Sequence, residues 1–93
     1  MRKKYRSHVG VLLDILRAID EEGGANVTRI MLKANIPYDR LKFYLTKLIN
    51  EGYLEKRIND EGKTVYVLTP KGVKLLSELL FLKEFFDSMG LPL

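Results

Sequence analysis

Apolar residues recur every three or four positions along the first half of this 93-residue chain. This spacing is that of one helix face, and it predicts helices over residues 7–22, 27–34 and 38–51. Ser7 and Asn26 each stand where a side-chain oxygen caps the start of a helix. Gly23, Pro37 and Gly52 are of the residue types that mark helix boundaries. The pattern therefore predicts three helices joined by short turns.

After the third helix the apolar period changes from about 3.6 to 2, as in a β-strand. Residues 53–58 and 63–68 are rich in β-branched and aromatic side chains and flank a four-residue turn that contains a glycine. These features predict a β-hairpin. Thr69 and Pro70 then form a strong helix start, so a fourth helix is expected over residues 70–89. The predicted fold class is α+β, mostly α.

Three helices followed by a two-stranded hairpin is the element order of a winged helix-turn-helix, in which the third helix enters the major groove of DNA and the hairpin, or wing, lies along the backbone. The core-facing stripe of the third helix would consist of Leu41, Leu45, Leu48 and Ile49. Its opposite face is polar and long-chained, as base contacts require. We expect groove contacts from Tyr38, Arg40, Lys42, Phe43 and Lys47. A solvated helix face is the alternative for the cations, and packing beside Tyr44 is the alternative for Phe43.

Further residues stand where the same fold would meet phosphate groups. Around the turn between the second and third helices these are Thr28, Arg29 and Lys33. In the hairpin they are the strand residues Lys56, Arg57 and Lys63, because two acids at the tip would repel phosphate. Residues 1–6 form a basic arm that we expect to be flexible and to contact phosphate or the minor groove through Arg2, Lys3, Lys4 and Arg6. A tail that only adds solubility is the alternative for this arm.

Charge is unevenly distributed along the chain. Lys and Arg number 16 against 12 Asp and Glu, and the basic arm carries the whole excess of +4. Residues 7–22 contain one basic and four acidic side chains, whereas residues 29–63 contain eight basic and five acidic ones. One side of the fold is therefore expected to be basic and another acidic, and a basic side favours an anionic partner.

Several classes of protein are excluded by the residue types present. The chain has no cysteine and one histidine, His8, which excludes structural zinc, iron–sulfur clusters, thiol catalysis and histidine-based triads. Paired inward carboxylates and Gly-rich phosphate loops are also missing, so we expect no enzymatic activity, no cofactor and no metal. No apolar run reaches about 18 residues, so no membrane partner is expected. The expected location is cytoplasmic and nucleoid-associated.

The fourth helix carries apolar side chains on two nearly opposite arcs. One arc contains Leu75, Leu79, Leu82, Phe85, Phe86 and Met89, and the other contains Val73, Leu76 and Leu80. A chain of this size cannot cover both, so we expect one arc to close the core and the other to pack against the same helix of a second copy. The first arc is the predicted homodimer contact. A membrane-surface helix and an apolar ligand pocket beneath the helix are the alternatives.

Residues 10–80 resemble a known family. The sequence TRIMLKANIPYDRLKFYLTKLINEGYLEKR, followed by YVLTPKGVKLL, is similar to archaeal winged-helix DNA-binding proteins of the small transcription-regulator and chromatin-associated type. The segments EGYLE and LTPKG occur widely in winged helices. The resemblance implies dimers that bind double-stranded DNA and are joined through a C-terminal helix. Here that helix is short and precedes Gly90 and Pro92, so a compact helix pair is expected rather than a long rod.

The predicted organisation is a basic arm over residues 1–6, a winged-helix DNA-binding domain over 7–69 and a dimerisation helix over 70–93. The predicted function is binding of double-stranded DNA by a homodimer that regulates transcription. Two alternatives stay open: a nonspecific chromatin or architectural protein, and a winged-helix module that docks on other proteins.

Overall fold

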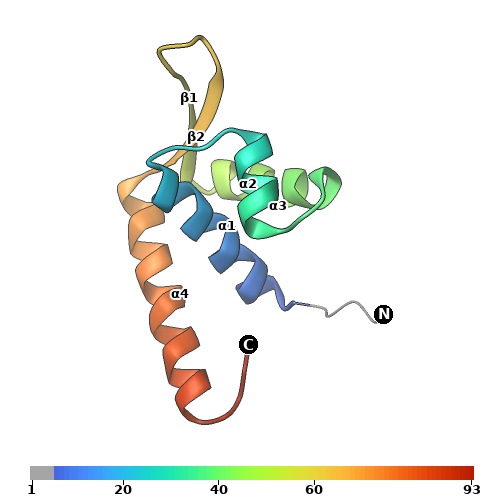
Figure 1. Ribbon diagram of the computed structural model, residues 1–93. Helices are drawn as coiled ribbons and strands as arrows, with labels where there is room; N and C mark the ends of the chain where they lie inside the picture. The colour runs from blue at the N-terminus through green and yellow to red at the C-terminus, as the bar shows by residue number, and fades with distance from the viewer. Residues whose placement is uncertain (1–5) are drawn as a thin grey trace.

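The computed structural model describes residues 6–93 and has the predicted order of elements. The helices and strands are α1 (His8–Glu22), α2 (Val27–Ala34), α3 (Tyr38–Asn50), β1 (Leu54–Ile58), β2 (Thr64–Leu68) and α4 (Pro70–Ser88). The hairpin of β1 and β2 projects from the helices, and α4 leaves the hairpin and runs along the opposite direction (Figure 1). The mostly helical winged helix-turn-helix fold predicted from the sequence is confirmed.

Helix starts coincide with the predicted capping residues. Ser7 Oγ accepts a hydrogen bond from the backbone N–H of Gly10 at 3.0 Å, and Asn26 Oδ1 accepts one from Arg29 at 2.9 Å. Thr69 caps α4 in the same way, immediately before a proline at the first helical position. Each such cap contributes about 1 kcal/mol, because it satisfies a backbone donor that the helix itself leaves unpaired.

Helix α1 lies at the centre of the fold, where it contacts α2, α4 and β2. Val11, Ile15 and Leu16 are fully buried, together with Ile30 of α2. Leu13 is buried as well, although at 100° per residue it lies outside the arc of Val11, Ile15 and Leu16. The helix is covered from more than one side, so a single stripe at helical spacing underestimates how much of it is buried.

The wing is an antiparallel pair in which Leu54 lies opposite Leu68 and Ile58 opposite Thr64. A short extra pairing joins it to the loop between α1 and α2. The backbone N–H of Ala25 donates to Tyr66 O at 3.0 Å, and the N–H of Tyr66 donates to Ala25 O at 2.8 Å. The sequence did not predict this pairing, because a single paired residue produces no alternating pattern of apolar and polar positions. It fixes the base of the wing against the body of the fold.

Helix α4 packs through a single face that lies between the two predicted arcs, which corrects both of them. Leu76 and Leu79 come from different predicted arcs, yet both lie in the chain's own core with 6% and 7% of their surface exposed. Beyond Leu80 the helix has left the body, and Phe81, Phe85 and other apolar side chains are exposed. The packed face is fully buried only as far as Leu79 and is half-buried at Phe86, whereas Val73 on the other side of the first half is exposed.

Candidate nucleic-acid interface

Helix α3 separates buried from exposed side chains cleanly. Its buried residues are Leu41, Tyr44, Leu45 and Leu48. All five predicted groove contacts are exposed on the remaining surface, namely Tyr38, Arg40, Lys42, Phe43 and Lys47. A face of this kind can meet a partner without any change of the fold.

One flank of α3 faces the wing. Tyr38 and Lys42 of α3 and Lys56 of β1 line the same cleft of about 150 Å³. Two cations from different elements therefore border one concavity. Such an arrangement attracts an anionic group more strongly than either cation alone.

The other flank of α3 carries an aromatic contact. The ammonium of Lys47 lies 4.7 Å from the ring centroid of Phe43, within cation–π range. The Phe43 ring meets the Tyr44 ring edge-on at 5.3 Å between centroids, so the packing foreseen as an alternative for Phe43 does occur. Phe43 nevertheless keeps 51% of its surface exposed and remains available to a partner.

Tyr44 and His8 form a contact that sequence reasoning missed. His8 Nδ1 and Tyr44 Oη lie 2.9 Å apart at a hydrogen-bonding distance, which ties the start of α1 to α3. Tyr44 stands three residues after Leu41 and four before Leu48, and this spacing could have placed it on the buried face. These residues border an apolar cleft of about 450 Å³ that also touches Leu75 of α4.

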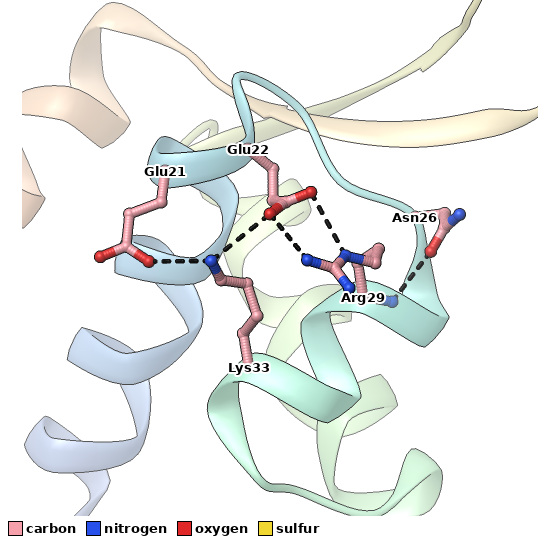
Figure 2. Close-up of polar contacts among 5 residues, drawn as sticks. All are labelled: Glu21, Glu22, Asn26, Arg29 and Lys33. Carbon is pink, nitrogen blue, oxygen red and sulfur yellow. Dashed lines mark hydrogen bonds and ion pairs between the residues drawn. The ribbon is translucent and has the colours of Figure 1, made fainter.

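Two of the predicted phosphate contacts, Arg29 and Lys33, form ion pairs within the chain. Arg29 of α2 donates from two nitrogens to the carboxylate of Glu22 at 3.1 and 3.3 Å. Lys33 Nζ lies 3.2 Å from Glu21 Oε1 and 3.4 Å from Glu22 Oε2. Figure 2 shows how these side chains of α1 and α2 face one another. The acidic end of α1 lies beside α2 and offsets both charges, so the phosphate contacts predicted for Arg29 and Lys33 would compete with these ion pairs.

This ionic cluster shifts the acid–base equilibria of its members. The hydrogen bond from Arg29 lowers the pKa of Glu22 below its usual 4.5, and Lys33 acts in the same direction. The same contacts raise the pKa of Arg29 and the pKa of Lys33. Glu22 therefore stays ionised in the folded chain at a pH where it would be partly protonated in the unfolded chain.

We expect the cluster to make folding stability depend on acid pH. The depressed pKa of Glu22 contributes stability that is present above pH 4.5 and is lost as the pH falls through the folded-state pKa. Urea unfolding of the wild type and of Glu22→Gln should therefore show a difference at pH 7 that shrinks below pH 4.5. A difference that stays constant down to pH 3 would contradict this role of Glu22.

Arg6 also differs from its predicted role in a flexible arm. Its guanidinium pairs with the carboxylate of Asp14 and donates to the carbonyl oxygens of Ala34 and Asn35 at 2.6 and 2.7 Å. Carbonyls at the end of α2 have no partner within the helix and suit a planar cation. Arg6 thus ties α1 to the turn before α3. The remaining arm residues, Arg2, Lys3 and Lys4, lie outside the described residues.

The other predicted phosphate contacts are all exposed, and one of them, Arg57, also forms an ion pair. Arg57 is paired with Glu55 on the same strand, with nitrogen–oxygen distances of 2.5 and 3.0 Å. Thr28, Lys56 and Lys63 are exposed.

Within residues 6–93 the structure has no cluster of three or more His, Asp or Glu side chains suited to a metal ion. None of the helices described there is long and apolar enough to span a membrane.

Comparison with known proteins defines the class. Residues 5–87 match the winged helix-turn-helix family, and the chain therefore belongs to it. Among solved structures, the fold is similar to Sso10a-2, a DNA-binding protein from Sulfolobus solfataricus, with a TM-score of 0.80 and 25% identity over 90% of this chain and 85% of that one. The predicted likeness to small archaeal winged-helix DNA-binding proteins is confirmed.

Larger transcription regulators share the fold. A MarR-family regulator from Silicibacter pomeroyi has a TM-score of 0.76 and 25% identity over 86% of this chain and 54% of its own. S. aureus MepR, solved in complex with DNA, has a TM-score of 0.67 and 18% identity over 92% of this chain and 60% of its own. The chain thus spans about half to three fifths of the length of these regulators. Curated protein sequences include no match to it.

Proposed function

We propose that the chain binds double-stranded DNA as a homodimer, inserts α3 into the major groove and regulates transcription. The observation that carries the proposal is the distribution of paired and unpaired cations. Arg40, Lys42 and Lys47 of α3 form no ion pair with any acidic group among residues 6–93. The cations of α2 and of the distal part of α4 are paired with neighbouring acids, whereas those of α3 remain available to phosphate.

The similar structures support this proposal. Sso10a-2 is described as a DNA-binding protein, and MepR was solved with DNA. The position of the wing also supports DNA binding, since Lys56 of β1 lines the same cleft as Lys42 of α3. A helix in the major groove would bring both side chains close to one strand of the duplex.

The distal half of α4 supports the homodimer. Phe81 has 68% of its surface exposed, Phe85 48% and Met89 57%, although water offers these side chains no favourable contact. Of the residues predicted to form the dimer contact, Leu82, Phe85, Phe86 and Met89 lie on this distal half. Leu75 and Leu79 lie on the proximal half, against the chain's own core. A two-fold mate that presents the same helix would cover the distal half on both copies.

We expect Lys42→Ala combined with Lys47→Ala to weaken DNA binding and its salt dependence together. Each phosphate contact contributes about 0.9 to the slope of log affinity against log salt, so the double variant should lower that slope by about two. The measurement is fluorescence anisotropy with a labelled duplex from 50 to 200 mM salt. Melting curves should match those of the wild type, because both side chains are exposed.

The matched control is Arg17→Ala, which removes an exposed cation that shares a cleft with Asp14 and Glu21 on α1. It should leave affinity and slope unchanged. Equal loss in both variants would show an effect of net charge rather than of α3. If the wild-type chain bound neither a random duplex nor a duplex from the region upstream of its own gene, the proposal of DNA binding would be refuted. Docking on another protein would then be favoured. Equal affinity for the two duplexes would favour the architectural alternative.

A further inference from the structure

The surface of α3 that projects farthest from the core is not where its cations lie. Opposite the buried stripe of Leu41 and Leu48, the helix presents Asp39, Thr46 and Asn50, all of them exposed. At 3.6 residues per turn these three fall within an arc of about 40°. The exposed ring of Phe43 lies about 20° beyond Asn50, at the edge of this strip. The outermost strip of the helix therefore carries an acid and borders an aromatic ring, but it has no cation.

The cations of α3 lie on both sides of this strip. Lys42 stands on the wing flank, where it shares the cleft with Lys56. Arg40 and Lys47 stand on the opposite flank, about 140 to 160° from Lys42 around the helix axis. Lys47 borders the apolar cleft on that side together with Phe43.

These positions match the dimensions of B-DNA. An α-helix with its side chains is about 10–12 Å across, and the major groove is about 12 Å wide. A helix that fits the groove so closely turns its outermost strip toward the base edges and its flanks toward the phosphates of the two strands. The cations then lie beside the groove walls rather than above the bases.

We propose that Asp39, Thr46 and Asn50 read the DNA sequence, while the cations of α3 hold the phosphates on the two sides of the groove. This inference rests on the proposed function and assigns base readout to residues other than the expected Arg40, Lys42 and Lys47. The amide of Asn50 suits the N6 and N7 atoms of adenine, and the carboxylate of Asp39 suits the N4 donor of cytosine. The methyl group of Thr46 suits the methyl group of thymine.

The acid in this strip favours sequence-specific binding over nonspecific binding. A carboxylate that faces DNA is repelled by phosphates of any sequence, and only a donor such as cytosine N4 offsets the repulsion. Among the described residues, no side-chain hydrogen bond or ion pair engages Asp39, Thr46 or Asn50, so all three are available to a partner. This contrasts with Arg29, which Glu22 holds.

The strip also limits the length of the sequence that one copy can read. Asp39 and Asn50 are eleven residues apart, which is about 16 Å along the helix axis. At about 3.4 Å per base pair, this distance corresponds to about five steps. One copy of α3 should therefore specify a half-site of no more than about five base pairs.

The test is selection of binding sites from a random duplex pool with the full chain, in parallel for the wild type, Asn50→Ala, Thr46→Ser and Lys42→Ala. The wild type should select a consensus that contains adenine and thymine positions. Asn50→Ala should lose preference at an adenine position, by about 5- to 150-fold, and keep the wild-type salt slope. Thr46→Ser, which removes the methyl group and keeps the hydroxyl, should lose preference at a thymine position.

Lys42→Ala serves as the matched comparison within the same helix. It should bind every duplex more weakly, lower the salt slope by about 0.9 and select the same consensus as the wild type. A consensus that changes in Lys42→Ala but not in Asn50→Ala or Thr46→Ser would overturn the assignment. A wild type that binds duplex DNA with no consensus would overturn base readout and leave DNA binding intact. A wild type that binds no duplex at all would instead remove the proposed function.

Discussion

Phe85→Glu is expected to convert the proposed dimer into a folded monomer. Phe85 has 48% of its surface exposed within one chain, so a carboxylate there is hydrated as long as the chain is alone. In a paired α4 the same carboxylate would be buried without a partner, and an uncompensated buried charge costs about 3–5 kcal/mol. Association should therefore weaken by at least about 100-fold. Light scattering over a range of protein concentrations measures this change.

Leu79→Glu is the contrasting variant on the same helix. Leu79 lies in the chain's own core with 7% of its surface exposed, so the new carboxylate would be buried even in a monomer. We expect this variant to unfold, with loss of the helical circular dichroism signal, whereas Phe85→Glu should keep it. A Phe85→Glu chain that associates as tightly as the wild type would show that the distal half of α4 is not the dimer contact.

Gly72→Ala is expected to destabilise the fold by about 1–3 kcal/mol, although alanine is the better helix former. Gly72 lies in the first turn of α4 and is buried. A Cβ atom at this position would collide with the backbone carbonyl oxygen of Tyr53, which belongs to the segment that enters the wing. Backbone atoms cannot rotate away as a side chain can, so α4 or the wing would have to shift. Urea unfolding measures the loss.

Gly10→Ala provides the control within the same chain. Gly10 lies in the first turn of α1, and a Cβ atom there would meet Ser7 Oγ at 3.4 Å, which is an ordinary contact. Because alanine lowers the conformational entropy of the unfolded chain, this substitution should stabilise the protein by up to about 1 kcal/mol. Stability changes of opposite sign at these two helical glycines would distinguish the effect of close packing from that of helix propensity. A Gly72→Ala chain as stable as Gly10→Ala would contradict the close approach of α4 to Tyr53.

Local signals predicted the secondary structure well. The boundaries of α1, α2 and α3 agree with expectation to within a residue at each end. A cap such as Ser7 or Asn26 acts within three residues of its own position, so the signal and its effect stand close together in the sequence. The hairpin was predicted equally well, since a change in the period of apolar residues and a glycine-containing turn are local features.

The site was predicted only in part. Exposure of Arg40, Lys42 and Lys47 follows from the apolar stripe of their own helix, and the structure agrees. Arg29 and Arg6 could not be assigned in this way. Arg29 is paired across two helices with Glu22, and Arg6 reaches a turn 28 and 29 residues away. Whether a surface cation is free or paired depends on neighbours that only the folded chain brings together.

The sequence by itself determined the order of the elements, their boundaries and the polar face of α3, because caps, glycines and apolar periods act within one or two turns of a helix. Only the tertiary structure decided which charges remain available, how the wing is held at Ala25, which face of α4 packs on the core and how far along the helix full burial extends. These features depend on contacts between distant segments. Helical spacing describes a helix as seen along its own axis, and it contains no information about where along that axis the neighbouring surface ends.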